Sequence, residues 1–258
     1  MNKFKILLLV CVVFLYQCKS TSSLAKSNTQ TMDLYLCIGQ SNMAGRAPIE
    51  VQDRDSIPNV FLFTGIEDMP WEKAANPLNK YSTIRKDLKM QKIGPSYGFA
   101  KEMAQAMPSQ KIGLIVNAKG GTSIEEWEPG KTFYNEAISQ VKKAIKDGVL
   151  KGVIWHQGEA NSRKYKQYMP KIAALIEALR KDLNAPNLPF VAGQLSPDKP
   201  LRNNFNTMIL ELPNTVENTG VVTTENTSTI DKTHFDSASQ RILGKRYATE
   251  MLKLILEK

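Results

Sequence analysis

Short apolar runs alternate with longer amphipathic patterns along most of the chain, and this alternation constrains the fold more than any other feature. Five short runs of mainly apolar residues are candidate strands, at 34–39, 60–63, 112–118, 152–156 and 190–195. A shorter and more polar run at 221–224 is a sixth candidate. Runs of this length, bounded by glycine, proline or polar residues, are typical of strands buried on both faces of a sheet.

Between these runs, apolar residues recur at the spacing of helices that bury one face. Such patterns occur at 97–107, 134–146, 168–183 and 237–256. Strands that alternate with helices pair in parallel, and the helices cover both faces of the sheet. The pattern predicts one α/β domain over residues 32–258, a three-layer α/β/α sandwich with a mostly parallel five-stranded sheet. Residues 64–92 break the pattern and are expected to form a rim over the functional site.

Residues 1–18 have the organisation of an export signal. Lys3 and Lys5 form a positive head, and the apolar run at 6–15 is too short to span a bilayer core of about 30 Å. The segment ends in Leu15-Tyr16-Gln17-Cys18, which resembles a bacterial lipoprotein box, in which the cysteine becomes the lipid-modified first residue. We expect Cys18 to be lipidated, and simple cleavage nearby is the alternative.

Residues 19–31 are rich in Ser and Thr and show no hydrophobic period, so they are expected to form a flexible tether. An exported chain of this kind belongs in the cell envelope, in the periplasm or at the outer membrane or cell surface, and would otherwise be secreted. The only membrane association that we expect is the lipid on Cys18.

The charge and the cysteines exclude several classes of function. The chain has 34 Lys+Arg against 25 Asp+Glu, but the basic residues are scattered, so no nucleic-acid partner is expected. Beyond the export segment only Cys37 remains, inside an apolar run, where a buried inert thiol is expected. The two histidines, His156 and His234, do not belong to a cluster with ligand spacing, so no metal and no cofactor are expected.

Four polar clusters lie next to the predicted strands and helices. Three of them follow candidate strands and one precedes the last helix, at 39–43, 117–123, 156–161 and 231–235. Ligands of doubly wound sheets bind beyond the carboxyl ends of the strands. We therefore expect the four clusters to meet at one edge of the sheet.

These clusters contain the groups that acyl transfer needs. Ser41 lies in a tight turn between strand and helix, where it could act as a nucleophile or simply cap the helix. His234 is the candidate base, and Asp231, three residues earlier, could fix its tautomer and stabilise the imidazolium. We expect His156, and with it Gln40, to shape the pocket or contact substrate.

Candidate donors for an oxyanion lie in the same clusters. The backbone N–H groups of Ser41 and of Gly120 or Gly121 are natural donors, because paired glycines let the backbone approach a ligand. Gln157 could supply a third donor from its side-chain amide. Which glycine donates is left open, with Gly121 preferred.

The third cluster also contains two residues whose roles are left open. Glu159 competes with Asp231 as the acid that orients the imidazole, or assists it. The three-residue spacing to His234 favours Asp231. Asn161 follows Gln157 by four residues and could support it.

The order and wording of the clusters resemble a known superfamily. A G-x-S-x-G nucleophile elbow is ruled out, because Met43 stands where glycine is needed. A serine first in the chain, with Asp and His together near the end, resembles the SGNH hydrolases, which have a flavodoxin-like fold. Over about residues 33–256, the blocks are similar to the sialate O-acetylesterase and acetylxylan esterase branch: Gly39-Gln40-Ser41-Asn42-Met43, Gly120-Gly121-Thr122-Ser123, Trp155-His156-Gln157-Gly158-Glu159 and Asp231-x-x-His234-Phe235.

The resemblance implies a serine esterase that removes O-acetyl groups from a carbohydrate such as acetylated xylan or sialic acid. It assigns Ser41 as nucleophile, His234 as base and Asp231 as the orienting acid. It gives the oxyanion to Ser41, Gly121 and Gln157, with Gln157 standing where most SGNH enzymes have Asn.

Two other functions remain as alternatives. A lipase or thioesterase of the same superfamily would need an apolar trough, whereas Lys119, Glu125 and Glu126 beside the clusters are polar. A non-catalytic glycan-binding protein on the same scaffold would have lost its catalytic residues, which are all present here. Three aromatic side chains could stack on sugar rings or serve only in packing: Trp71, Tyr97 and Trp127.

Overall fold

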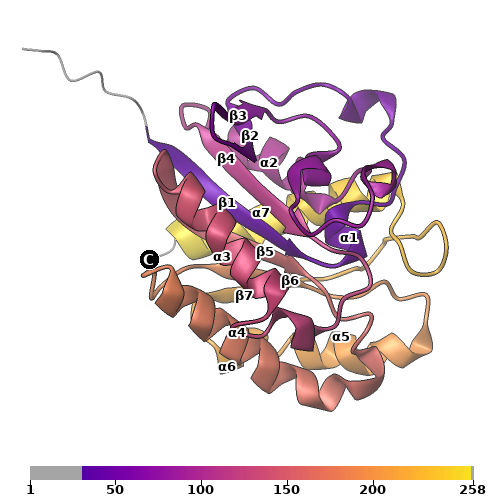
Figure 1. The fold of residues 1–258 in the computed structure, drawn as a ribbon. Coiled ribbons are helices and arrows are strands. Elements are labelled where there is room, and N and C mark those ends of the chain that lie inside the picture. Colours follow the sequence, from indigo (N-terminus) through magenta and orange to yellow (C-terminus); the bar gives the residue numbers. More distant parts are fainter. Residues whose placement is uncertain (1–30, 257–258) are drawn as a thin grey trace, which may run out of the picture.

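The computed structural model describes residues 31–256 and contains a seven-stranded sheet between two layers of helices (Figure 1). The strands run in the order β3-β2-β4-β1-β5-β6-β7 across the sheet, and each neighbouring pair is parallel except β2 and β3. Their bounds are Met32–Gly39 (β1), Val60–Ile66 (β2), Met69–Lys73 (β3), Ile112–Ala118 (β4), Gly148–His156 (β5), Phe190–Gly193 (β6) and Thr219–Val222 (β7). The predicted α/β class with a mostly parallel sheet is confirmed.

The prediction of five strands was wrong by two. One addition is β7, at the sixth candidate run, and the other is β3, which lies within residues 64–92. The β3 sequence, Met-Pro-Trp-Glu-Lys, has no buried apolar alternation, because it is an edge strand that pairs only with β2. A proline and charged side chains are tolerated at a sheet edge, so this strand does not have the pattern of a central one.

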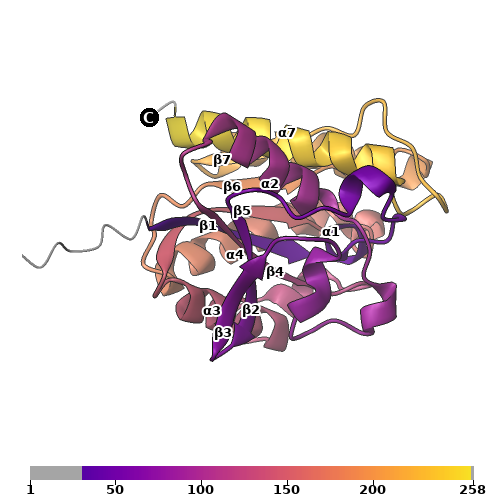
Figure 2. The same cartoon turned by 90° about the horizontal axis from the view of Figure 1, so that it is seen from above.

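Helices cover both faces of the sheet (Figure 2). Pro95–Ala106 (α2) and Ser237–Leu256 (α7) pack on the face that receives Tyr35 and Cys37 of β1. On the opposite face, Leu34, Leu36 and Ile38 pack with Thr132–Ala144 (α3) and Tyr168–Asp182 (α4). The shorter helices are Ser41–Ala44 (α1), Asn203–Ile209 (α5) and Leu212–Thr215 (α6), and 3-10 turns occur at Val51–Asp53, Leu78–Tyr81, Leu88–Met90, Ile124–Trp127, Ser162–Gln167 and Pro200–Arg202.

The alternation of side chains along β1 explains the state of the single cysteine in the described residues. Cys37 is fully buried between the sheet and α2, and burial raises the pKa of its thiol to about 12. The thiol therefore stays protonated at neutral pH, as expected of an inert core residue.

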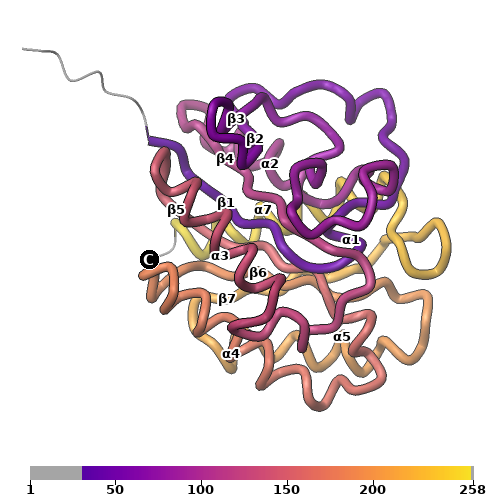
Figure 3. Tube along the Cα trace, in the orientation of Figure 1, coloured from indigo at the N-terminus to yellow at the C-terminus, as the bar shows by residue number. Residues whose placement is uncertain are grey.

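Strand register brings the polar clusters to one level. The last residue of β1, Gly39, lies opposite Ala118 of β4 and His156 of β5, so the three central strands end together. Gly39 has a φ of 139°, and a Cβ there would lie 2.2 Å from the His156 carbonyl oxygen. In Figure 3 the segment before α7 returns to this edge, beside α1.

The export signal, Cys18 and nearly all of the predicted tether lie outside the described residues. Within residues 31–256, no helix has the combination of length and hydropathy that a membrane span requires.

Candidate active site

A serine, a histidine and a carboxylate form a continuous line of hydrogen bonds at the carboxyl edge of the sheet. Ser41 Oγ lies 3.0 Å from His234 Nε2, and His234 Nδ1 lies 2.6 Å from Asp231 Oδ2. With Nδ1–H donating to the carboxylate, Nε2 is left to accept the serine proton. The structure thus brings together the three predicted residues, across 193 positions of sequence.

The turn around Asp231 holds its carboxylate in place. Asp231 Oδ1 accepts the backbone N–H groups of Thr233, at 3.0 Å, and of His234, at 2.7 Å. Burial alone would raise the pKa of Asp231, but the hydrogen bonds from His234 and Thr233 outweigh it and lower that pKa below its ordinary value. The carboxylate is therefore ionised at neutral pH and can stabilise a neighbouring imidazolium.

The two glycines after β4 serve different needs. Gly120 passes close to the nucleophile: a Cβ there would lie 3.4 Å from Ser41 Cβ, an ordinary contact distance, and 2.6 Å from Arg46 Nη2, the end of a flexible side chain that can shift. Gly121 has a φ of 78°, a backbone conformation that side chains other than glycine rarely adopt. Within residues 31–256, the N–H groups of Ser41, Gly120 and Gly121 donate to no protein acceptor. All three are free to donate to an oxyanion.

The side-chain amide of Gln157 is already engaged, which corrects its predicted role as a free oxyanion donor. Its Nε2 lies 2.9 Å from the Thr122 carbonyl, 2.9 Å from Asn161 Oδ1 and 3.2 Å from Gln40 Oε1. An amide NH₂ has only two hydrogens, so these three oxygens exhaust it. Gln157 instead ties the loop after β4 to the loop after β5, and Asn161 takes part in the same connection.

Gln40 and His156 are buried, so of the two expected roles, shaping the pocket and contacting substrate, their positions fit the first. Gln40 is 3% exposed and His156 is fully buried, with His156 Nδ1 2.9 Å from the Tyr247 hydroxyl. Burial, helped by the charge of Arg202, lowers the pKa of His156 to about 3, so the ring is neutral. It packs edge-to-face on Phe235, the neighbour of His234.

The competing carboxylate, Glu159, makes no hydrogen bond to His234. Its Oε1 accepts Asn42 Nδ2 at 2.5 Å, and its buried Oε2 has no partner among the described residues. Desolvation by burial raises the pKa of Glu159 above its ordinary value. Contact with the imidazole therefore belongs to Asp231, as the spacing predicted.

Comparison with known proteins identifies the family. The model of a family described as "carbohydrate esterase, sialic acid-specific acetylesterase" matches residues 31–253. The chain belongs to this carbohydrate esterase family. It is also 30% identical over 176 residues to a probable carbohydrate esterase of Arabidopsis thaliana, and the match spans 61% of this chain and 66% of the relative, just under two thirds.

Solved structures agree with the fold of this esterase. The crystal structure of the same Arabidopsis protein superimposes with a TM-score of 0.78 at 26% identity, over 87% of this chain and 99% of that one. A carbohydrate acetylesterase of Xanthomonas citri gives 0.63 at 21% identity, over 88% of this chain and 57% of that one. A family two carbohydrate esterase of Cellvibrio japonicus gives 0.52 at 10% identity, over 88% and 62%. The last two comparisons support the fold alone.

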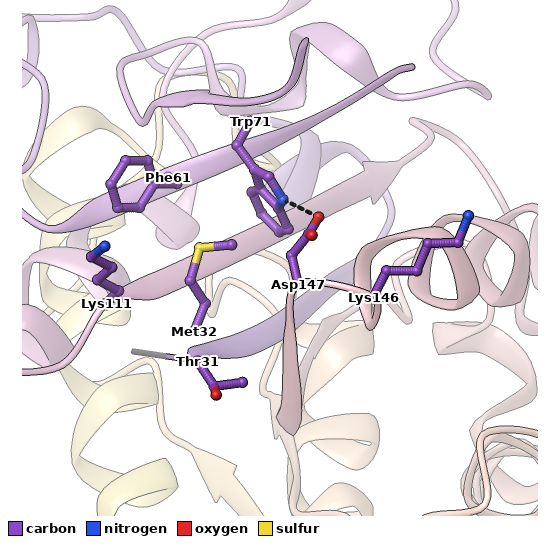
Figure 4. Close-up of a pocket in the computed structure, with 7 residues that line it drawn as sticks. All are labelled: Thr31, Met32, Phe61, Trp71, Lys111, Lys146 and Asp147. Carbon is purple, nitrogen blue, oxygen red and sulfur yellow. Dashed lines mark hydrogen bonds between the residues drawn. The ribbon is translucent and has the colours of Figure 1, made fainter. Parts of the chain in front are cut away.

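The three aromatic side chains considered for sugar stacking are not placed for it. Trp127 is fully buried and packs edge-to-face on Trp155, while Tyr97 is 4% exposed and donates its hydroxyl hydrogen to a backbone carbonyl. Trp71 lies at the opposite edge of the sheet, in the pocket of Figure 4, where its Nε1 donates to Asp147 at 2.9 Å. All three aromatics therefore serve packing in this esterase.

Part of the predicted rim does reach the catalytic edge. Asn79 pairs with the backbone of Ala118, at the end of β4, through its Nδ2 and Oδ1. Ser82 donates its hydroxyl hydrogen to Asn117 Oδ1 at 2.8 Å. Residues 69–73 instead form β3, so only the later part of the segment borders the site.

Two residues at the site had no role in the sequence interpretation. Asn42 stands in the first block directly after the nucleophile, and that adjacency is a signal that could have found it. Arg202 is 3% exposed and contacts the His234 turn from a distant loop, and no local pattern marks it. Within residues 31–256, no three His, Cys, Asp or Glu side chains gather as metal ligands would.

Proposed function

We propose that this esterase hydrolyses O-acetyl groups of a carbohydrate through an acyl-enzyme intermediate. The observation that carries the proposal is the line of hydrogen bonds from Ser41 Oγ through His234 to Asp231. It matches the arrangement in which a serine is activated by a base that a carboxylate orients. Membership of the carbohydrate esterase family supports the substrate class.

The reaction follows from the positions of these atoms. Ser41 Oγ attacks the acetyl carbonyl carbon while its proton passes to His234 Nε2, 3.0 Å away. The N–H groups of Ser41 and of Gly120 or Gly121 stabilise the oxyanion. The tetrahedral intermediate then expels the sugar oxygen, which takes the proton from His234. Water, deprotonated by His234, attacks the acetyl-serine, and acetate leaves as Ser41 regains its proton.

The charged surroundings of Ser41 favour a short acyl group on a polar substrate over a long acyl chain. Arg46 Nη2 lies against Gly120, and Lys86 Nζ would be 3.8 Å from a Cβ at Gly121. A lipase or thioesterase needs an apolar groove for a long acyl chain beside its nucleophile, and these two charged side chains do not form one. We expect p-nitrophenyl acetate to be hydrolysed much faster than p-nitrophenyl octanoate, and the opposite preference would contradict the acetylesterase proposal.

Acetate release tests the substrate directly. Acetylated xylan, acetylated sialic acid and acetylated pectin are compared side by side, with Ser41→Ala as the control. We expect acetate from at least one glycan, and a loss of more than about a thousandfold in the Ser41→Ala variant with the fold retained. A folded Ser41→Ala variant that keeps its activity would contradict the assignment of Ser41 as the nucleophile. If p-nitrophenyl acetate is cleaved but no glycan releases acetate, the proposed carbohydrate substrate is contradicted.

We also propose that the esterase is exported and anchored through a lipid on Cys18. The support is the order of Lys3 and Lys5, the apolar run 6–15 and the cysteine soon after it. Cys18→Ala is expected to move the protein from the membrane fraction to the soluble fraction. Unchanged membrane association, or a mature N-terminus mapped downstream of Cys18, would contradict lipidation.

A further inference from the structure

The turn that carries Asp231 and His234 depends on groups outside it. It has little regular structure, with Asn226 and Lys232 at positive φ and one isolated bridge between Thr229 and Phe235. The carboxylate of Asp231 is itself about half exposed, at 49% for the side chain. Such a turn needs fixed partners if His234 is to stay within 3.0 Å of Ser41 Oγ.

One side chain contacts the backbone on both sides of His234. Asn42 Nδ2 donates to the Thr233 carbonyl at 3.1 Å, and Asn42 Oδ1 accepts the Phe235 N–H at 3.1 Å. Asn42 is fully buried and follows Ser41 directly in α1. Asn42, next to the nucleophile, therefore forms hydrogen bonds with the backbone directly before and directly after His234.

Glu159 determines which way the Asn42 amide faces. Its Oε1 accepts the same Nδ2 at 2.5 Å. A carboxylate has only acceptors to offer a neighbouring NH₂ group, so the amide must turn its oxygen toward Phe235. A glutamic acid protonated on the unpartnered Oε2 would still accept at Oε1, so the contact survives the raised pKa of this group.

Arg202 holds the same turn from its other side. Its Nη1 donates to the Lys232 carbonyl and its Nη2 to Thr233 Oγ1, both at 3.2 Å. The guanidinium does not reach Ser41 through any hydrogen bond of the described residues. It restrains the turn, whereas Asn42 also links the turn to the nucleophile.

We propose that Asn42, oriented by Glu159, is a positioning residue that sets the approach of His234 Nε2 to Ser41 Oγ. The inference deepens the proposed esterase function and rests on it. Neither Asn42 nor Glu159 touches a reacting atom. Their contribution is geometric, so it appears in kcat while leaving the Asp231–His234 pair intact.

The test measures p-nitrophenyl acetate hydrolysis by variants of both residues. Asn42→Ala is expected to lower kcat by about a hundredfold, the cost of a misplacement of about 1 Å, with little change in KM. Glu159→Met, which offers no acceptor, is expected to approach the same loss. Glu159→Gln keeps an acceptor at Oε1 and loses only the charge, so about tenfold is expected. The midpoint of the pH profile of kcat/KM is expected to stay in place in Asn42→Ala, which removes no charge from the surroundings of His234.

A matched control comes from a similar contact elsewhere. Asn206 pairs with both the N–H and the carbonyl of Leu195, at 2.8 Å each, as Asn42 pairs with its turn. Asn206→Ala is expected to lower the unfolding midpoint about as much as Asn42→Ala does, while kcat stays near wild type. If Asn42→Ala does not fold, Asn42→Asp keeps the shape and places an oxygen against Glu159 and the Thr233 carbonyl, and it is expected to lose at least as much kcat.

A double variant separates a shared pathway from two independent effects. Because Glu159 acts through Asn42, Asn42→Ala with Glu159→Met is expected to lose no more kcat than Asn42→Ala alone. Losses that multiply would overturn the proposal, as would an Asn42→Ala variant with wild-type kcat or with a shifted pH profile of kcat/KM. Failure of the proposed esterase function is a different result: Ser41→Ala would then keep its activity on p-nitrophenyl acetate.

Discussion

The two carboxylates near His234 sit in opposite environments and do different work. Asp231 lies on a half-exposed turn, accepts two backbone N–H groups and the imidazole, and has a lowered pKa. Glu159 lies after a central strand with its carboxylate buried, accepts one amide, and has a raised pKa. Of the two carboxylates, the one that contacts His234, Asp231, is therefore the more exposed. Burial, often taken as a mark of a catalytic acid, here accompanies a positioning role.

The largest expected effect separates the two carboxylates by activity. Asp231→Asn replaces the acceptor of His234 Nδ1–H with an amide, and an equivalent change in a serine protease costs about ten-thousandfold in kcat. Glu159→Gln is expected to lose about tenfold, since its contact with Asn42 persists. Turnover of p-nitrophenyl acetate by both folded variants measures the ratio. A Glu159→Gln variant less active than Asp231→Asn would reverse the comparison.

A smaller effect is expected in the pH dependence of stability. The pKa of Asp231 in the folded protein is below 3.8, its value in the unfolded chain. Between these two pKa values the unfolded chain binds more protons than the folded protein does. The ionised Asp231 carboxylate therefore stabilises the fold above pH 3.8, and this stabilisation is lost as the pH falls through the folded-state pKa. Glu159 has a folded-state pKa above 4.5, so its contribution is present below 4.5 and lost as the pH rises through the folded value.

Urea unfolding between pH 3 and pH 8 measures these two contributions. Relative to wild type, Asp231→Asn is expected to lose stability as the pH rises from 3 to 5, whereas Glu159→Gln is expected to gain stability as the pH rises above 4.5. The opposite slopes follow from the opposite pKa directions. Parallel slopes would mean that the two carboxyl groups titrate alike, and the contrast between their environments would fail.

The smallest effect is expected at a third carboxylate, remote from His234. Asp147 accepts Trp71 Nε1 at the opposite edge of the sheet (Figure 4). Asp147→Asn is expected to leave kcat and KM for p-nitrophenyl acetate unchanged, because no atom at the catalytic edge contacts this pair. A loss of activity in that variant would show that substituting a carboxylate far from His234 also lowers turnover. The activity difference between the Asp231 and Glu159 variants could then not be assigned to their contacts at the catalytic edge.

The parts of the site that sequence could predict are those with local causes. Asp231 and His234 are three residues apart, so one turn joins them, and Ser41 follows a strand whose end is marked by Gly39. The parallel sheet then brings these segments to one edge without further information. The fold class follows for the same reason, from alternating strands and helices.

The parts that could not be predicted depend on contacts between distant segments. Whether His156, at the end of β5, faces solvent or the core is decided by α7, which supplies Tyr247. Gln157 loses its free N–H groups to oxygens of Gln40 and Thr122, from two other segments, and of Asn161 in its own loop. Arg202 forms hydrogen bonds with Lys232 and Thr233, about thirty positions away in the chain, and no sequence motif links these residues.

The direction of β1 has a consequence for how a large polymer would meet the enzyme. Met32 begins this strand and Ser41 lies just past its end, so eight residues of extended chain, about 26 Å, separate the point where the chain enters the sheet from the nucleophile. A lipid on Cys18 would therefore attach the chain on the side of the sheet where β1 begins, and the nucleophile lies at the opposite end of that strand. Polysaccharides too large to lie between protein and bilayer could then be deacetylated at their exposed side groups, and reach would be set by the anchor and not by diffusion of the enzyme.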